Sequence, residues 1–497
     1  MTTTKVAHHA RPRSASERDR RISTLLFFGV LGVYLAVDQG SHYAYDGNAM
    51  LAVSANLVNH GTLKTVGAFH DSFHLSTPYA PYGIAMSLLG TIPIAAAKAL
   101  GHTNVAISLV NPLITAAAVV VTYRIGRALD WLAGHAVMAA VSFGLLSMAL
   151  VYTTEYFSEP AVTLCCVALV LGIIRWGQGR TLAPLLVGLA AGAALQFRTD
   201  SLVTIWVGLL AIPLFVGWNE LRRVHSIVML GLPLVISLVA LGAYNHLRYA
   251  KFFVANYGGV TFTTPIGTGL HGFFFSSGKS LFIFNPLAAL GVVGLFVLIK
   301  RNGPLAVLFV LLIVTRLVFF ARWSAWDGGW SWGPRFLLPI VPLLMVSGVE
   351  VLRATTTTSL AGVATRVVAG LLAGASVVVN YLSIRVPYQQ WTQVLSTPER
   401  ALFHIGPLSS GAVFNAYTYD PNLSPMWGDV RLLRHHLAQM GPELWRDGHG
   451  IIGAAILVIG AALLTWAALE ARAARRRPDH QDADQIVAPS HSEVPAP

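Results

Sequence analysis

Residues 300–336 read KRNGPLAVLFVLLIVTRLVFFARWSAWDGGWSWGPRF. A basic pair comes first, an apolar run follows over residues 304–321, and a tryptophan-rich loop around Asp327 comes last. A helical run of this length crosses a hydrocarbon core of ~30 Å. Lys and Arg accumulate in the cytoplasmic loops of membrane proteins. The stretch therefore predicts a membrane-spanning helix whose tryptophan-rich end lies on the outer side.

The composition of the whole chain agrees with a membrane protein. Hydrophobic residues make up 55% of the 497 residues and charged residues 11%, a balance that excludes a soluble domain of this length. The net charge of +12 does not indicate nucleic-acid binding, because the arginines are spread in pairs at the ends of apolar runs. The two cysteines are adjacent within one apolar run, so no disulfide framework is expected.

About twelve apolar runs have the length or context of transmembrane helices. We predict spans near residues 22–40, 105–123, 133–152, 157–174, 181–196, 201–217, 225–244, 284–300, 304–321, 335–352, 363–381 and 450–469. With the N-terminus inside, nearly all of the basic pairs fall on the cytoplasmic side of this arrangement. The fold class predicted is an all-α polytopic membrane protein.

One further apolar run, residues 81–99, is long enough to cross the membrane. If it crossed, every later arginine pair would move to the outer side. We therefore expect residues 81–99 to form a helix that lies in or dips into the outer leaflet.

The chain divides by composition into four parts. We expect a basic cytoplasmic leader over residues 1–21, a membrane module over 22–352, and a C-terminal membrane region over 353–470. The last outer loop, residues 382–449, is too small and too scattered in hydrophobicity to predict an independent domain. The Pro-, Asp- and Ser-containing segment 471–497 is expected to be a disordered cytoplasmic tail.

Asp46 is the main candidate for chemistry. It follows the first span and precedes a predicted short helix, residues 47–59, of which it would be the N-cap. An outward carboxylate at this position is suited to general-base work on an acceptor hydroxyl. The alternative is a purely structural cap, and Asp38 is the second candidate for the base.

A second acidic group, Glu155 and Glu159, lies where the third span ends and the fourth begins. Their spacing of four predicts that the two carboxylates share a helix face. A carboxylate at membrane depth is costly unless it is paired or functional. The alternative is an ordinary acidic helix start.

Several cations fall on the predicted outer side. Arg198, Arg248 and Lys279 could bind a phosphate-bearing substrate through charge-assisted hydrogen bonds, although each could instead extend to lipid headgroups. Arg316 lies within the ninth span and is expected to be paired or functional.

The tryptophan-rich loop offers a sugar or acceptor surface as well as an aromatic belt at the membrane boundary. The candidate binding residues there are Trp323, Trp326, Asp327, Trp330 and Arg335. The Gly328–Gly329 pair would allow the backbone to turn sharply and approach a ligand.

These motifs resemble the GT-C superfamily of membrane glycosyltransferases, especially bacterial relatives of protein mannosyltransferases and lipid A aminoarabinose transferases. The likeness covers roughly residues 20–350 and rests on four segments: DGNAMLAVSANLVNHG (46–61), YAPYGIAMSLL (79–89), YFSEP (156–160) and QFRTDS (196–201). The resemblance implies a GT-C-like bundle with two juxtamembrane helices. It makes Asp46 the counterpart of the catalytic base, Glu159 that of the second acidic motif, and Arg198 that of the cation meeting the carrier phosphate.

The chain departs from this pattern in one place. Relatives like the aminoarabinose transferases carry Lys-Pro before the second juxtamembrane helix, whereas this chain has Ala80–Pro81. Lys279 or Arg248 would then have to replace the missing lysine.

The sequence as a whole predicts a glycosyltransferase at the outer face of the cytoplasmic membrane. The expected donor is a polyprenyl-phosphate sugar, with mannose or arabinose as the sugar, and the expected acceptor is a cell-envelope glycan, lipid or protein. A transporter or flippase and a non-catalytic cell-wall assembly protein are the alternatives. No cofactor is certain, and no His/Asp cluster has a spacing that decides whether a divalent metal is used.

Overall fold

Helices make up the architecture of the chain. A computed structural model describes residues 13–40, 44–65, 78–100, 108–254, 261–356, 358–437 and 450–476, and it contains no strand within them. With η marking a 3₁₀ helix, the elements are α1 Arg13–Val37, α2 Tyr45–His60, α4 Ile84–Leu100, α6 Val110–Ala128, α7 Ala133–Leu145, η1 Val151–Thr153, α8 Glu159–Gly177, α9 Ala183–Phe197, α10 Ser201–Leu210, η2 Ile212–Leu214, α11 Trp218–Leu221, α12 Val224–Tyr249, α13 Ile266–Phe275, α14 Leu281–Phe284, α15 Ala288–Arg301, α16 Gly303–Arg322, η3 Arg335–Ile340, α17 Val341–Ala354, α18 Leu360–Arg385, α19 Tyr388–Ser396, η4 Pro398–Phe403, α20 Ser410–Tyr419, α21 Pro425–Arg434 and α23 Gly450–Arg476.

Each predicted span coincides with a helix, so the all-α polytopic fold is confirmed. By length and composition, seven candidate spans are found in the described part of the chain: Ser16–Val37, Glu159–Gly177, Val224–Tyr249, Gly303–Arg322, Arg335–Ala354, Leu360–Arg385 and Gly450–Ala473. Other predicted spans correspond to shorter helices, such as α7 and α9, which pack inside the bundle. The number of membrane crossings therefore stays a prediction.

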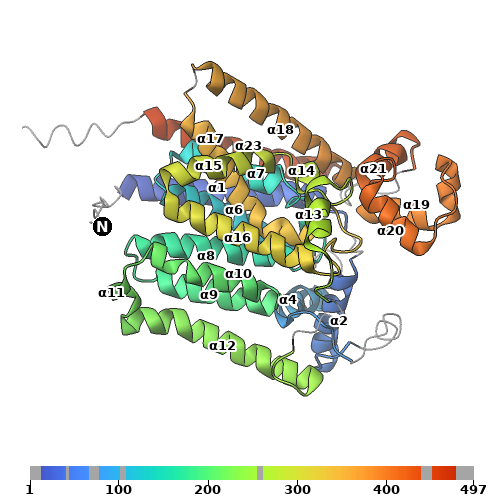
Figure 1. Cartoon of the computed structure of the whole chain (residues 1–497), viewed down its shortest axis with the longest axis horizontal. Coiled ribbons are helices and arrows are strands. Elements are labelled where there is room, and N and C mark those ends of the chain that lie inside the picture. The colour runs from blue at the N-terminus through green and yellow to red at the C-terminus, as the bar shows by residue number, and fades with distance from the viewer. Residues whose placement is uncertain are drawn as a thin grey trace, which may run out of the picture.

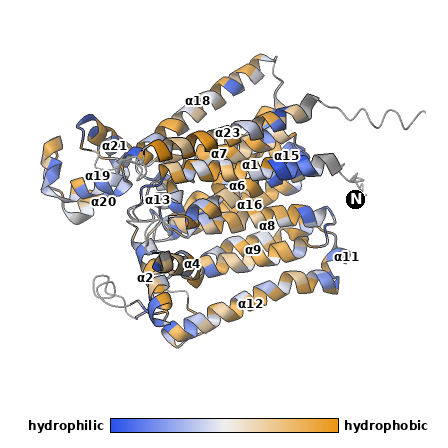
Figure 2. Ribbon diagram, turned by 180° about the vertical axis from the view of Figure 1, so that it is seen from behind, coloured by the Kyte–Doolittle hydropathy of each residue, from blue (hydrophilic) through white to orange (hydrophobic). Residues whose placement is uncertain are grey.

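The long helices run side by side, and smaller elements gather at one end of them. In Figure 1 the helices α2 and α4 lie at the same end of the bundle as α19, α20 and α21, whereas α11 lies at the other end. Apolar residues cover the long helices and polar residues concentrate toward the ends (Figure 2). This distribution matches a bundle embedded in lipid along its length.

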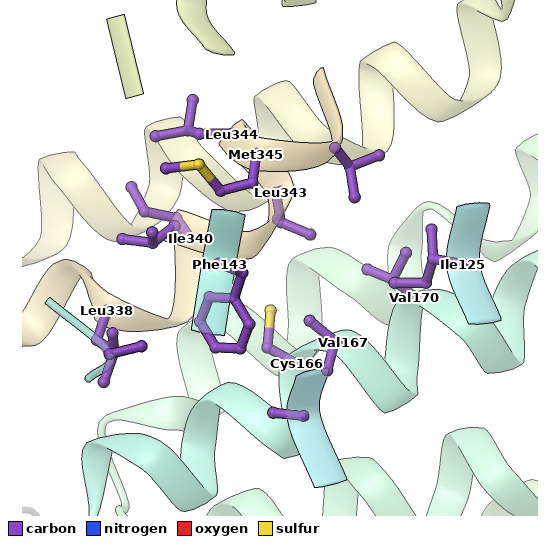
Figure 3. Packing of buried hydrophobic residues seen from close by; sticks show 14 of the residues in the cluster. Ile125, Phe143, Cys166, Val167, Val170, Leu338, Ile340, Leu343, Leu344 and Met345 are labelled. Atoms are coloured by element: carbon purple, nitrogen blue, oxygen red, sulfur yellow. The ribbon is translucent and has the colours of Figure 1, made fainter. Parts of the chain in front are cut away.

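A continuous apolar core joins the central helices. Ile125 of α6, Phe143 of α7 and Val167 of α8 are buried in one cluster with Ile340 of η3 and Leu343 of α17, and Figure 3 shows Phe143 close to Ile340. Because lipid tails are as apolar as these side chains, close van der Waals packing rather than removal from water holds the central helices together. This packing fixes η3, and η3 carries one of the site residues.

The helix predicted not to cross lies across one end of the bundle. α4 packs against α2 and against α9, and Figure 1 shows it beside α2 rather than along the length of the long helices. Its Gly90 lies against the side chains of Ser54 and Tyr156, so α4 contacts both α2 and the loop before α8.

The segment after α18 differs from expectation, because part of the predicted loop 382–449 has a small core of its own. Residues of α19, α20 and α21 bury a cluster that includes Trp391, Leu395, Val413 and Leu432. We call residues 386–434 the outer module. Its scattered apolar residues converge only when three short helices fold together, which a single hydropathy window does not detect. Residues 438–449 lie outside the described residues.

The chain ends also differ in part from expectation. α1 begins at Arg13, so the basic residues from Arg18 to Arg21 belong to the first helix. α23 continues to Arg476, so residues 471–476 of the predicted tail are helical. Residues 1–12 and 477–497 lie outside the described part of the chain.

Candidate functional site

Asp46 lies within the first turn of α2 rather than at its N-cap. The capping position belongs to Ala44, which makes no side-chain cap, and the helix begins at Tyr45. The N-cap prediction was therefore wrong. The Asp46 carboxylate instead binds side chains from other parts of the chain.

Two groups bind the Asp46 carboxylate from different segments. Tyr82 donates its hydroxyl to Oδ1 at 2.8 Å, and Arg335 forms an ion pair with Oδ2 at 2.7 Å. Burial opposes ionisation of this group, but attraction to Arg335, the Tyr82 hydrogen bond and a contribution from Arg198 outweigh it and lower the pKa of Asp46. The side chain stays 17% exposed, so a ligand can still reach it.

Arg335 is presented by a constrained segment. It follows Pro334 and starts η3, and its guanidinium lies over the rings of Phe157 at 4.7 Å and Phe336 at 4.9 Å. Arg316, the cation within α16, donates to the carbonyl oxygen of Phe336. Arg316 is thus bound to the backbone of the residue next to Arg335.

Glu159 and Arg198 extend this centre inward. Arg198 donates to Glu159 Oε1 at 2.8 Å and to Asp200 Oδ2 at 2.6 Å and 2.8 Å, and all three side chains are buried. Glu159 Oε1 also lies 3.8 Å from Nε of Arg335. One chain of charges therefore runs from Asp46 through Arg335, Glu159 and Arg198 to Asp200, which we call the charge network.

Glu155 does not share a helix face with Glu159. α8 begins at Glu159, and Glu155 lies in the preceding loop, so the expectation of helical spacing was wrong. Pro160, at the second position of α8, is typical of the first turn of a helix, where the missing amide hydrogen would have no partner within the helix. The Glu155 carboxylate instead accepts from the backbone amide of Ala44 at 3.3 Å and from Gln389 of the outer module at 3.2 Å.

Tyr388, next to Gln389, also faces this region. Its side chain is buried, and its hydroxyl has no hydrogen-bond partner within the described residues. Burial and the neighbouring carboxylate of Glu155 raise the pKa of Tyr388 well above its usual value. The outer module thus places polar groups beside the charge network.

Arg248 lies beside Ala80–Pro81, where the resembling enzymes have Lys-Pro. Its guanidinium donates to the carbonyl oxygens of Ala80 at 2.9 Å and Tyr82 at 3.0 Å, and it stacks over Tyr244 at 4.0 Å. The cation therefore contacts the backbone at the Ala80–Pro81 position. It also holds the segment that carries Tyr82 against Asp46.

Lys279 holds the tryptophan-rich loop through hydrogen bonds to its backbone and to one of its side chains. Its ammonium donates to the carbonyl of Gly329 at 2.7 Å, to the carbonyl of Ser331 at 2.8 Å and to the hydroxyl of Ser331 at 3.1 Å. These acceptors match the three N–H bonds of the group. Burial lowers the pKa of Lys279 to about 7, and Asp327 opposes that effect.

The tryptophans themselves divide between core and surface. Trp323 and Trp326 are buried, whereas Trp330 is 39% exposed and packs edge-on against Phe414 and Tyr417 of the outer module. Asp327 accepts from the backbone amide of Gly329 at 2.6 Å. This loop is therefore a bridge between the bundle and the outer module, with Trp330 at its surface.

The structure thus joins four of the predicted site residues, Asp46, Glu159, Arg198 and Arg335, in one network. Glu155, Arg248 and Lys279 lie around it and bind neighbouring segments. Asp38, the second candidate for the base, is buried at the end of α1 beside Gln39, whose amide binds carbonyls at the end of α18. Sequence reasoning missed the roles of Tyr82 and Gln389, because nothing local marks a partner 36 or 234 residues away.

No metal centre is evident in the part of the chain that the structure describes, where no three His, Cys, Asp or Glu side chains are close enough to bind one ion together. The carboxylates of the charge network are paired with arginines instead.

Among known proteins, no family profile matches this sequence and no curated protein is detectably similar to it. The structure is similar to ArnT from Cupriavidus metallidurans in two crystal structures. The form bound to undecaprenyl phosphate has 14% identity and a TM-score of 0.48, with 94% of this chain and 78% of that chain covered. The apo form has 15% identity and a TM-score of 0.49, with 93% and 77% covered.

Proposed function

We propose that this protein is a membrane glycosyltransferase that moves a sugar from a polyprenyl-phosphate carrier to an acceptor hydroxyl. The observation that carries the proposal is the pairing of Asp46 with Arg335 at the end of the bundle that carries α2, α4 and the outer module. A carboxylate beside a guanidinium supplies both groups that such a reaction needs, a base for the acceptor and a cation for the departing phosphate.

The reaction replaces one bond by another at the anomeric carbon. The acceptor oxygen attacks that carbon while the bond to the carrier phosphate breaks, and the acceptor proton passes to Asp46. The polyprenyl phosphate leaves with the bonding electron pair. Its developing negative charge is stabilised by Arg335, whose guanidinium is fixed over two aromatic rings before substrate arrives.

The lowered pKa of Asp46 keeps the group ionised at neutral pH. It also makes Asp46 a weak base while Arg335 is its partner. When the donor phosphate binds Arg335, the phosphate competes with Asp46 for the guanidinium, and the carboxylate gains proton affinity. Donor binding thereby activates the base.

Arg198 supports this centre through carboxylates. Asp200 and Glu159 hold its guanidinium, so a phosphate would have to compete with both. We propose that Arg198 fixes Glu159 beside Arg335 and adds positive potential at the donor phosphate. Arg248 acts similarly by fixing the Tyr82 segment.

The sequence motifs favour a class of donor and a class of acceptor. The likeness of four sequence segments to GT-C enzymes favours a polyprenyl-phosphate sugar, with mannose or arabinose as the sugar. The exposed Trp330 beside the outer module favours an acceptor of the cell envelope. The arginine-pair register favours a location in the cytoplasmic membrane with this site on the outer face.

A reconstituted assay tests the proposal. Purified protein in liposomes would receive polyprenyl-phosphate mannose or arabinose, or the matching nucleotide sugar, together with envelope glycan. We expect transfer from one lipid-phosphate sugar and none from the nucleotide sugar. Movement of the lipid-phosphate sugar across the bilayer without glycan product would instead establish a flippase and refute the proposal.

A further inference from the structure

A cavity of about 320 Å³ separates α18 from the rest of the bundle. Its other walls come from α7, α15 and α17, and most of its lining is apolar, as with Met138, Leu290 and Met345. Among the described residues that line it, Arg366 is the one charged side chain. The cavity is thus an apolar space with a cation at its margin.

The spacing along α18 explains this shape. Arg366, Ala369, Gly370 and Ala373 recur every three or four residues and therefore share one face of the helix. Small residues on that face leave room between α18 and α17. From Arg366 to Ala373 the helix rises by about 10 Å, so the space runs from one end of the bundle toward its middle.

The end of the cavity near Arg366 is positively charged. Arg301 and Arg353 both pair with the single carboxylate of Glu350, at 3.2 Å and 2.6 Å. Arg366 donates to the carbonyls of Gly362 at 2.8 Å and Thr355 at 3.3 Å. Arg366 itself forms no ion pair with a carboxylate among the described residues, because the Glu350 carboxylate is shared by Arg301 and Arg353.

We propose that this cavity binds one acyl chain of an anionic phospholipid, whose phosphate lies at Arg366. The apolar lining favours a hydrocarbon chain, and the guanidinium of Arg366 at its margin, which no carboxylate pairs with among the described residues, favours a negatively charged headgroup. A neutral lipid would satisfy only the first condition. The lipid lies at the end of the bundle opposite the charge network, so this inference does not depend on the proposed reaction.

Native mass spectrometry of the purified full chain in detergent tests the proposal. Phosphatidylglycerol and phosphatidylcholine with identical acyl chains are titrated separately. We expect the wild-type protein to bind one phosphatidylglycerol about fivefold more tightly than phosphatidylcholine, as expected for roughly one basic residue at the membrane surface. Arg366→Gln should abolish that preference, and the matched change Arg385→Gln at the other end of α18 should preserve it.

A second pair of variants tests the cavity itself. Ala373→Trp fills the space and should weaken binding of both lipids, whereas Leu371→Trp places the same indole where the side chain is already 70% exposed and should change neither. Equal affinities of the wild-type protein for the two lipids, or unchanged binding in Ala373→Trp, would overturn the proposal. A wild-type protein that is a dimer, and that Ala373→Trp converts to a monomer, would also overturn the proposal, because the cavity would then be a contact between two copies of the chain.

Discussion

The Asp46 carboxylate is shared between a neutral donor and a cation. Tyr82 holds one oxygen and Arg335 the other, and each oxygen keeps a lone pair for a further contact. Substrate can therefore approach without first displacing both partners. In this account the two partners have different roles, because Arg335 also meets the donor phosphate whereas Tyr82 only positions the base.

Replacing Tyr82 by Phe should move the acid limb of the pH–rate profile to higher pH. The hydroxyl stabilises the ionised form of Asp46, so its loss raises the pKa of that carboxyl and requires a higher pH for the base to be ionised. The profile of kcat/KM against pH for the free enzyme measures this shift. Tyr381→Phe removes the same atom from an exposed position on α18 and should leave the profile unchanged. An acid limb that coincides in the two variants would show that Tyr82 does not act on Asp46.

Replacing Arg198 by Lys should be harmful despite the retained charge. A lysine lacks the planar fork that binds Asp200 twice while also reaching Glu159. Loss of one charged hydrogen bond costs about 1.5–3 kcal/mol. We expect a lower melting temperature and roughly tenfold weaker donor binding, measured by thermal unfolding and donor titration. Arg385→Lys, at an exposed helix end, is the control. Identical stability and donor binding in the two variants would show that Arg198 does not support the donor site.

Among the elements, the tryptophan-rich loop determines where Arg335 lies. Gly328 and Gly329 have φ values of +73° and +67°, in the left-handed region that favours glycine. A Cβ at Gly328 would lie 2.8 Å from Cγ of Arg335, whereas a Cβ at Gly329 would meet no atom within 4 Å. The two glycines therefore carry the same backbone strain but differ in their contact with the site.

This pair permits a matched test. Gly328→Ala and Gly329→Ala should each destabilise the loop by about 1 kcal/mol through the backbone. Only Gly328→Ala should also displace Arg335 and lower turnover, by about tenfold or more, because a displacement of about 1 Å from a productive geometry can cost ~10²-fold. Thermal unfolding and turnover of both variants measure the two effects. Equal turnover in the two variants would contradict a role for Arg335 in catalysis.

The helices show what a sequence can reveal about this protein. The apolar runs that gave α8, α16 and α18 were predictable because length and hydrophobicity are local properties. The contact between Arg198 and Asp200 is local too, because the two residues are two positions apart in the sequence. Tyr82 and Gln389 were not predictable, because their partners come from distant segments that only tertiary packing brings together. The outer module was missed for the same reason.

The proposed reaction requires that the charge network lie at the end of the bundle that faces the outside of the cell. α2 and α4, which begins just after Tyr82, lie at one end of the bundle, and α11 lies at the other (Figure 1), whereas Arg301 and Arg353 occupy the last turns of α15 and α17. From the positive-inside rule we propose that the second end lies in the cytoplasm. With that orientation, a site at the first end would meet lipid-linked sugars on the outer face rather than cytosolic nucleotide sugars.

Cysteine labelling in intact cells tests this orientation. Asn59→Cys, at the exposed end of α2, should react with an impermeant thiol reagent added outside, and Arg180→Cys, in the exposed loop between α8 and α9, should react only after permeabilisation. The native Cys165 and Cys166 are buried and give little background. The opposite labelling pattern would invert the topology and place the site in the cytoplasm.

The most direct test of the central claim is the turnover of Asp46→Asn. This variant keeps the shape of the side chain and removes the base, so the account predicts a loss of ~10²–10⁴-fold in transfer from the polyprenyl-phosphate sugar. Donor binding and thermal stability, measured in parallel, should show that the protein remains folded, and Asp38→Asn serves as the matched carboxylate control. An Asp46→Asn protein that keeps more than half of the wild-type turnover would remove Asp46 from the mechanism and contradict the account.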